Sequence, residues 1–148
     1  MKKIIIIIFL LFTISCGYKP IYSSNDQLIL KFDKIISSGD EKINRQIINV
    51  LGLEENTSSK HELLLTTTYN IEKTSKNLKG EVETYRSIIK TQLKLKKGEK
   101  IVKSKNFLNE FSYNNKDNKY ELTKYQNEIK SNLINDLTEE IILFLKLL

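Results

Sequence analysis

Residue types that carry catalytic, redox or metal-binding chemistry are scarce in this chain of 148 residues. It contains one cysteine, one histidine, one proline and no tryptophan. A single cysteine cannot form a disulfide within the chain, and one cysteine with one histidine does not supply the ligands of a usual zinc site. Glycine-rich phosphate loops and the G-x-S-x-G and H-E-x-x-H motifs are also missing. We therefore expect no catalytic, cofactor-binding or metal-binding residues, and we predict that the protein is not an enzyme.

The few groups that could still take part in chemistry have a simpler interpretation. His61 stands at the start of an expected strand among polar neighbours, which is typical of a surface residue. The carboxylate pair Glu54 and Glu55 falls in an expected loop, and Glu139 and Glu140 fall on an expected helix. Solvent-exposed charge is the usual state of such residues.

Positive charge is in modest excess, with 24 lysines and arginines against 18 acidic residues and a formal net charge of +6. Such a balance suits anionic partners such as phosphate-bearing lipids, a membrane surface or nucleic acid. The chain is also rich in lysine, asparagine and isoleucine and poor in alanine, a bias that a skewed genomic base composition produces without a functional cause. The net charge by itself therefore does not identify a partner.

The start of the chain has the order of an export signal. Lys2 and Lys3 are followed by an unbroken apolar run over residues 4–12, and then by Thr13, Ile14, Ser15 and Cys16. The apolar run has the length of a signal peptide and is short of the ~20 residues that cross a bilayer as a helix. This order predicts a signal peptide over residues 1–15.

The four residues that end at Cys16 resemble a bacterial lipobox, although Thr13 stands where leucine is usual. In bacterial lipoproteins this thiol is alkylated with diacylglycerol, the signal is cut just before it, and the new amine is acylated. The alternatives are a plain signal peptide followed by an unmodified cysteine, or an uncleaved anchor. We favour lipidation of Cys16, because a single exported cysteine has no disulfide partner. An exported chain also gives no reason to expect a nucleic-acid partner.

Three segments follow from this order: a signal peptide over residues 1–15, a lipidated tether over residues 16–27, and one domain over residues 28–148. The tether is polar and contains Pro20, and the residue before a proline prefers an extended backbone. A domain of this length buries roughly two-thirds of its unfolded surface, so it needs neither a disulfide nor a metal to fold.

The spacing of apolar residues predicts six elements in the domain. We expect strands over residues 28–36, 61–73, 82–96 and 100–113, and helices over residues 39–51 and 120–147. Ser38 and Glu41 match a capping box at the start of the first helix, and residues 53–60 read as a polar loop. One face of the three long strands should be buried: Leu63, Leu65, Thr67, Tyr69, Ile71, Tyr85, Ser87, Ile89, Thr91, Leu93, Leu95, Phe107, Phe111 and Tyr113.

Short turns join the last three strands, so they should form an antiparallel meander, while the first strand is joined to them through a helix. The order β-α-β-β-β-α predicts an α+β fold, a two-layer sandwich in which a mixed four-stranded sheet has two helices on one face. The other face is polar but carries Leu64, Ile88 and Leu108. We expect something outside this chain to cover part of that face.

Basic side chains project from the same polar face of the middle strand. For Arg86 and Lys90 two interpretations are balanced: contacts to the phosphates of a lipid headgroup, which a guanidinium can engage bidentately, or a solvated strand surface. Other lysines cluster at two hairpin turns: Lys73, Lys76 and Lys79 at the first, and Lys94, Lys96, Lys97, Lys100, Lys103 and Lys105 at the second. They are better explained as solvated charge that protects edge strands from pairing.

Several of these features occur together in one known family. Residues 16–22, Cys-Gly-Tyr-Lys-Pro-Ile-Tyr, are similar to the C-G-F-x-P-L-Y start of lipopolysaccharide (LPS)-assembly lipoproteins of the LptE type. The β-α-β-β-β-α order also matches that family, as do Tyr85-Arg86 in the middle strand and Ser112-Tyr113 ahead of Tyr120 and Tyr125. The resemblance covers essentially the whole chain after the signal.

This resemblance implies a component of the outer-membrane LPS translocon. Members of the family lie partly inside the large β-barrel LptD, plug it, assist its assembly and bind LPS. The expected partners are an LptD-type barrel, LPS and the outer membrane, which the N-terminal acyl chains would enter while the domain faces the periplasm and lies partly within the barrel.

The alternative is a stand-alone periplasmic lipoprotein that binds LPS or another lipid. It would need a pocket between sheet and helices that is large enough for acyl chains, whereas the dense apolar pattern favours a filled core. The family's basic LPS contacts do not align clearly with this chain, so a contact between LPS phosphates and Arg86 or Lys90 is a separate hypothesis.

Overall fold

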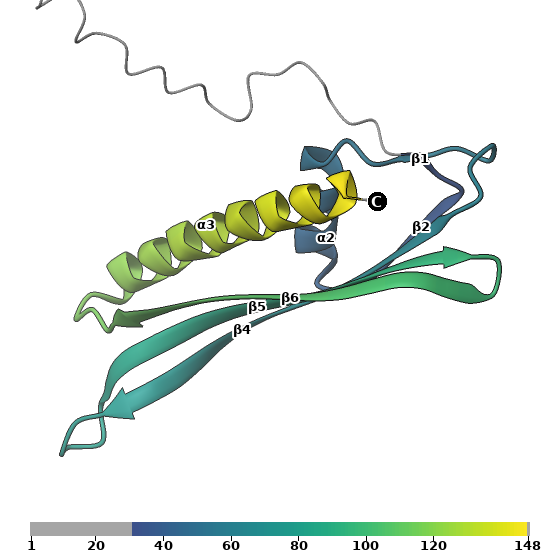
Figure 1. Cartoon of the computed structure of the whole chain (residues 1–148). Helices are drawn as coiled ribbons and strands as arrows, with labels where there is room; N and C mark the ends of the chain where they lie inside the picture. Colours follow the sequence, from purple (N-terminus) through teal and green to yellow (C-terminus); the bar gives the residue numbers. More distant parts are fainter. Residues whose placement is uncertain (1–30, 148) are drawn as a thin grey trace, which may run out of the picture.

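The computed structural model describes residues 31–147 (Figure 1). Its elements are β1 (Lys31–Phe32), β2 (Lys34–Gly39), α2 (Glu41–Val50), β3 (Glu54–Glu55), β4 (Glu62–Lys76), β5 (Val82–Lys97), β6 (Lys100–Asn114) and α3 (Lys119–Lys146). The predicted signal peptide over residues 1–15, the tether over residues 16–27 and the lipidation site Cys16 lie outside the described residues, so these assignments stay predictions.

Four strands form one sheet in the order β2-β4-β5-β6. β2 runs parallel to β4, whereas β4, β5 and β6 are antiparallel neighbours. The parallel pair follows from the chain order, because parallel neighbours need a crossover connection and α2 supplies it. The mixed sheet and the order of its elements confirm the α+β fold expected from the sequence.

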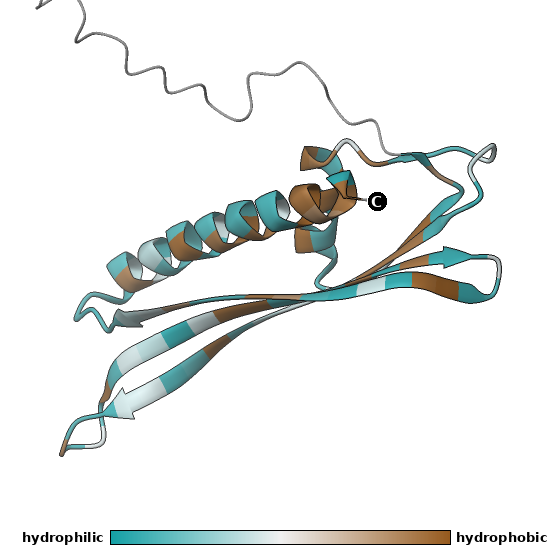
Figure 2. Cartoon of the chain, in the orientation of Figure 1, coloured by the Kyte–Doolittle hydropathy of each residue, from teal (hydrophilic) through white to brown (hydrophobic). Residues whose placement is uncertain are grey.

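Both helices lie on the same side of this sheet (Figure 1). One apolar cluster joins Ile43 and Ile47 of α2, Leu137 and Ile141 of α3, and Ile89 of β5, and each of these side chains is at most 1% exposed. The C-terminal part of α3, which contacts α2, is almost continuously apolar in Figure 2. The core is therefore thickest where both helices meet the sheet.

The period-2 pattern of the long strands gives the buried face correctly, with three exceptions: Ile88 is only 8% exposed although it lies on the opposite face, and two residues in phase with the core are exposed. Ile71 and Phe111 are in phase with the core but are 40% and 48% exposed. Ile71 lies beyond Thr67, where pairing with β2 ends, so β4 has no outer neighbour there among residues 31–147. Phe111 lies on β6, one of the two edge strands of the sheet. Alternation fixes the face of a residue, whereas burial also depends on neighbouring elements.

The first helix begins later than the capping-box pattern predicts. Ser38 is still part of β2, where it pairs with Thr66 and the two hydroxyl oxygens are 2.8 Å apart. Asp40 is the N-cap instead, and its Oδ1 accepts hydrogen bonds from the backbone N–H groups of Lys42 and Ile43, each at 3.1 Å. The prediction that Ser38 caps this helix is wrong, because strand pairing already uses that residue.

Gly39 lets the chain leave β2 and enter α2 at once. Its φ is +84°, and a Cβ at this position would collide with the carbonyl oxygen of Thr67 on β4. The next N–H, that of Asp40, donates to the same oxygen at 2.8 Å. Only glycine has both the backbone freedom and the missing side chain that this approach requires.

The strand expected over residues 28–36 is also divided within its described part. β1 and β2 are separated at Asp33, whose N–H donates to the carbonyl oxygen of His61 at 2.8 Å. β1 instead pairs in parallel with β3, which lies inside the region predicted as a loop over residues 53–60. Two-residue strands give too short a pattern for sequence reasoning to detect.

Candidate functional site

The side of the sheet opposite the helices, which we call the open face, has no covering element among residues 31–147 (Figure 1). Strand alternation and cross-strand pairing place one set of side chains there. The set comprises Leu64, Thr66, Thr68, Arg86, Ile88, Lys90, Gln92, Lys94, Asn106, Leu108, Glu110 and Ser112. The open face therefore mixes hydrogen-bonding, basic and aliphatic side chains.

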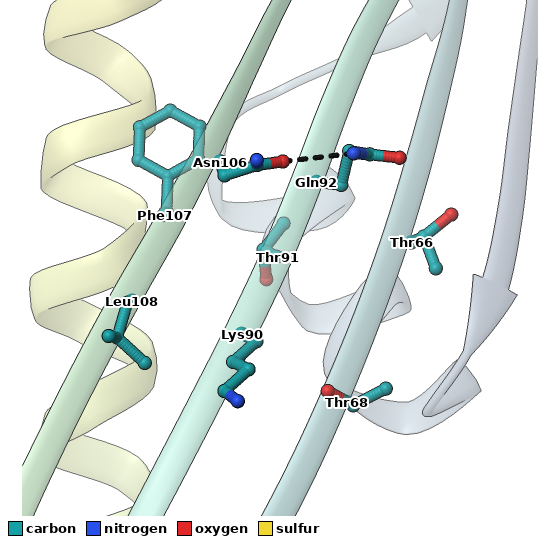
Figure 3. Close-up of a pocket in the computed structure, with 8 residues that line it drawn as sticks. All are labelled: Thr66, Thr68, Lys90, Thr91, Gln92, Asn106, Phe107 and Leu108. Carbon is teal, nitrogen blue, oxygen red and sulfur yellow. Dashed lines mark hydrogen bonds between the residues drawn. The ribbon is translucent and has the colours of Figure 1, made fainter.

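A shallow hollow of about 340 Å³ lies near the middle of the open face (Figure 3). Its lining comes from three strands: Thr66 and Thr68 of β4, Lys90, Thr91 and Gln92 of β5, and Asn106, Phe107 and Leu108 of β6. At one end the amide Nε2 of Gln92 donates to Oδ1 of Asn106 at 3.0 Å. The hollow thus offers hydroxyl and amide groups beside one ammonium group and one aliphatic side chain.

Among residues 31–147, Lys90 is the only ionisable residue that lines this hollow. Its neighbours across the strands are Thr68 on β4 and Leu108 on β6. An ammonium group between a hydroxyl and an aliphatic surface can pair with an anionic group that carries an apolar attachment. Of the two basic residues singled out from the sequence, Lys90 is therefore the one placed to contact a bound molecule.

Arg86 lies on the same face but outside the hollow. Its Nε donates to Oγ of Ser112 at 3.2 Å, and one terminal nitrogen is 3.7 Å from a carboxylate oxygen of Glu110. Glu72 is its partner across β4. Because the Glu110 carboxylate lies close to it, the guanidinium presents less free positive charge to a phosphate than its sequence position suggests.

The structure does not bring Arg86 and Lys90 together on one ligand group. They stand four residues apart on one strand, which corresponds to about 13 Å between their Cα atoms. The guanidinium of Arg86 is directed to Ser112 and Glu110, whereas Lys90 lines the hollow that Arg86 does not reach.

Several of the clustered lysines already have contacts within the chain. The Nζ of Lys96 is 3.8 Å from a carboxylate oxygen of Glu62. Lys105 lies over the rings of Phe107 and Phe144, at 4.8 Å and 5.3 Å from their centroids. These contacts support the interpretation of the lysine clusters as surface charge that shields apolar groups.

A chain of hydroxyl groups crosses the opposite, helix-covered face. The Oγ of Ser87, which is fully buried, is 3.1 Å from the hydroxyl oxygen of Tyr69 and 3.2 Å from that of Tyr113. Burial raises the pKa of Tyr69 above its ordinary value of 10.0, with a smaller rise from Tyr113, while the hydrogen bond to Ser87 acts in the opposite direction. These hydroxyls hydrogen-bond one another, whereas Oδ1 of Asn109, the partner of Ile89 on β6, is buried with no hydrogen-bond partner among residues 31–147.

Two further features bear on the classes of protein considered above. Among residues 31–147, no three histidine, cysteine or acidic side chains lie close enough to hold a metal ion. In the same part of the chain, neither helix has the length and apolar content needed to cross a membrane. His61 is an exposed residue just before β4. The absence of enzymatic activity stays a prediction.

Sequence reasoning found Lys90 and Leu108 but missed the polar residues of the hollow. Thr66, Thr68, Gln92 and Asn106 look like ordinary strand residues when each strand is considered alone. Only the cross-strand register shows that they are neighbours. The positions of the two hairpin turns were the one signal that could have grouped them, because the turns set which residues of neighbouring strands lie opposite each other.

The fold and this face define a class of protein. It is a two-layer α+β domain that buries one sheet face under two helices and exposes the other as a mixed polar and aliphatic surface. A mostly polar sheet face that carries exposed aliphatic side chains such as Leu108 is compatible with a binding or assembly domain.

Solved bacterial lipoproteins have this same fold. Rare lipoprotein B from Shewanella oneidensis superposes with a TM-score of 0.58 at 10% identity, over 76% of this chain and 93% of that one. An uncharacterized lipoprotein B from Nitrosomonas europaea gives 0.56 at 12% identity over 87% of both chains. A minor lipoprotein from Acinetobacter baumannii gives 0.52 at 15% identity, over 76% and 89%.

No protein-family model matches the chain, and no curated protein matches its sequence. With identities this low, the structural comparisons establish the fold. For the fold, the resemblance to lipoproteins of the LptE type is confirmed.

Proposed function

We propose that this protein is an outer-membrane lipoprotein that assists the assembly of an LptD-type β-barrel, plugs it, and so supports LPS insertion at the cell surface. The fold shared with the solved lipoproteins is the observation that carries this proposal. The lipobox-like sequence that ends at Cys16 supports it independently, because it supplies the anchor that such a protein needs.

The open face supports an assembly role. Leu108 is 56% exposed there, and Ile36 of β2 adds a further aliphatic side chain that is 39% exposed. Hydrogen-bonding residues separate these aliphatic positions. A surface of this composition suits the mixed polar lining of a barrel lumen better than it suits bulk water.

The alternative of a stand-alone lipid carrier receives less support. A carrier would enclose acyl chains between the sheet and the helices, where Leu63, Leu93 and Leu137 are each 0% exposed and pack in one cluster. One hollow lies on the open face, and another opens between the β4–β5 turn, the start of β5 and the start of α3, where most of its lining is polar or charged. The central space between sheet and helices is filled by side chains, and the opening at its end is lined mostly by polar groups that do not suit an acyl chain.

Within the proposal, Lys90 is the candidate contact for an LPS phosphate, and Arg86 is a secondary one. Lys90 lines the hollow beside Leu108, so an LPS phosphate and the start of an acyl chain could be accommodated together. Arg86 is already engaged with Ser112 and Glu110. Both assignments belong to the proposal.

Affinity purification from solubilised outer membranes tests the proposed function. A tagged copy of the lipoprotein should recover one LptD-type barrel in a stable complex, while an unrelated tagged lipoprotein expressed at the same level should not. Recovery of the lipoprotein alone would contradict the proposal. LPS or another lipid bound to that isolated lipoprotein would then favour the carrier.

A further inference from the structure

The turn between β4 and β5 presents one leucine directly to solvent. Leu78 has a relative exposure of 108%, the highest of the exposed large apolar residues among residues 31–147. The turn stands at the far end of the two long strands, away from α2 and β2 (Figure 1). Leu78 therefore contributes no buried apolar surface to the domain that carries it.

A single exposed apolar residue is common on protein surfaces, but this one sits on a turn that is held in shape. Asn77 takes part in five hydrogen bonds across the turn. Its Oδ1 accepts from the N–H groups of Lys79 and Glu81 at 2.9 and 3.0 Å. Its backbone N–H donates to the carbonyl of Glu81, and its carbonyl accepts from the N–H of Gly80, both at 2.9 Å.

The fifth hydrogen bond of Asn77 fixes the position of the acidic group in the turn. Nδ2 of Asn77 donates to a carboxylate oxygen of Glu81 at 2.8 Å and holds that acidic group back in the turn. Lys76 and Lys79, on either side of Leu78, are exposed. The leucine is thus presented between two ammonium groups.

We propose that Leu78 is an anchor that inserts into an apolar pocket of a protein partner whose rim carries carboxylates. The proposed function supplies the identity of that partner, the LptD-type barrel, and this inference rests on it. A turn that is already ordered loses little conformational freedom on binding, so more of the contact free energy appears as affinity. The flanking lysines fit the acidic rim and direct the tip towards it.

A lipid surface suits this tip less well than a protein pocket. Burial of one leucine side chain provides far less than a myristoyl chain, and a myristoyl chain alone holds a protein only marginally on a membrane. A preformed pocket, by contrast, surrounds a single side chain on all sides and removes it fully from water.

Replacement of the anchor tests the inference in the full-length protein. Leu78→Ser should lower the amount of barrel recovered by the tagged lipoprotein by about 10- to 100-fold, which corresponds to the loss of one buried leucine. Leu78→Met should keep most of it. Val50→Ser is the matched control, because Val50 is 58% exposed on α2, away from the turn, and its loss should leave recovery unchanged.

Asn77 is a positioning residue, and its variants separate shape from contact. Asn77→Ala should lower barrel recovery although Leu78 remains, and should speed hydrogen exchange at the amides of Lys79 and Glu81. Asn77→Asp keeps the acceptor oxygen for both amides but sets a carboxylate against that of Glu81, so Asn77→Asp combined with Glu81→Gln, which supplies the donor from the other side, should restore much of the recovery. If the unmodified protein and both variants at Asn77 recover equal amounts of barrel, Asn77 has no positioning role.

The outcomes distinguish the anchor from the proposed function. If the unmodified protein recovers the barrel and Leu78→Ser recovers it equally well, the anchor is wrong and the proposed function stands. If the unmodified protein recovers no barrel, both fail. Because the chain lacks tryptophan, Leu78→Trp reports the environment of the tip on phosphatidylethanolamine–phosphatidylglycerol vesicles without the barrel. Water-exposed emission is expected, and blue-shifted emission would overturn the inference in favour of a lipid surface.

Discussion

The two faces of one strand show how this domain divides its tasks. On β5, Ile89 is fully buried beneath the helices, while its neighbour Lys90 points to the open face and lines the hollow. One residue of displacement along the chain separates the core from the candidate binding surface. Substitutions on the covered face should therefore change folding, and substitutions on the open face should change binding.

The largest effect is expected from removal of core volume. Ile89→Ala should lower the free energy of unfolding by about 2–5 kcal/mol, because it leaves a cavity in a region that is 0% exposed. Leu108→Ala, its counterpart on the open face, should change that free energy by less than about 0.5 kcal/mol. Urea denaturation of the two variants measures both values, and similar costs would break the comparison between the faces.

A smaller effect is expected from the buried hydroxyl chain. Ser87→Ala should cost about 1–3 kcal/mol, because it leaves the hydroxyls of Tyr69 and Tyr113 without their shared partner in a buried place. Ser112→Ala removes an exposed serine that accepts only from Arg86, and it should stay within about 0.5 kcal/mol. If thermal unfolding shows that both variants lose the same stability, the buried hydroxyl groups do not stabilise the covered face.

The same buried hydroxyl groups predict that stability depends on pH in the alkaline range. Burial raises the pKa of Tyr69 above 10.0, so the folded state keeps this phenolic proton more tightly than the unfolded state. Its contribution is complete below pH 10 and is lost as the pH rises through the raised pKa. Tyr69→Phe lacks this contribution and should lose less stability between pH 9 and pH 11. Denaturation midpoints that fall in parallel for both proteins would refute the assignment.

Substitutions of charged residues on the open face should have the smallest effect on stability. They should instead change binding. Lys90→Glu should weaken LPS binding by about three- to ten-fold, the size of an exposed charge contact. Arg86→Glu should weaken it less, since Glu110 already offsets that guanidinium. Titration with fluorescent LPS measures both. Stronger loss at Arg86, or no loss at Lys90, would reverse the order that the structure suggests.

Much of the fold could be predicted because the long strands carry a clear pattern. The positions of Leu63, Leu65, Ile89 and Leu93 on one face fixed the orientation of β4 and β5, and their burial confirms it. The stripe of apolar residues on α3 was equally clear, and Asn118 caps that helix through the N–H groups of Tyr120 and Glu121. Long repeats of one spacing are reliable because many residues agree.

Short elements and side-chain neighbours could not be predicted in the same way. Ser38 has the right spacing for a helix cap, but its pairing with Thr66 depends on a strand 28 residues away. The offset of Arg86 by Glu110 and the hollow around Lys90 likewise arise from registers between strands. The sequence alone contains the residues of this candidate site but not their arrangement.

The amount of folded LptD-type barrel in the outer membrane after depletion of this protein tests the central claim most directly. The proposed function predicts that the folded barrel disappears as the lipoprotein is depleted, and that it returns when the lipoprotein is supplied again. A normal amount of folded barrel in cells that lack this protein would contradict it.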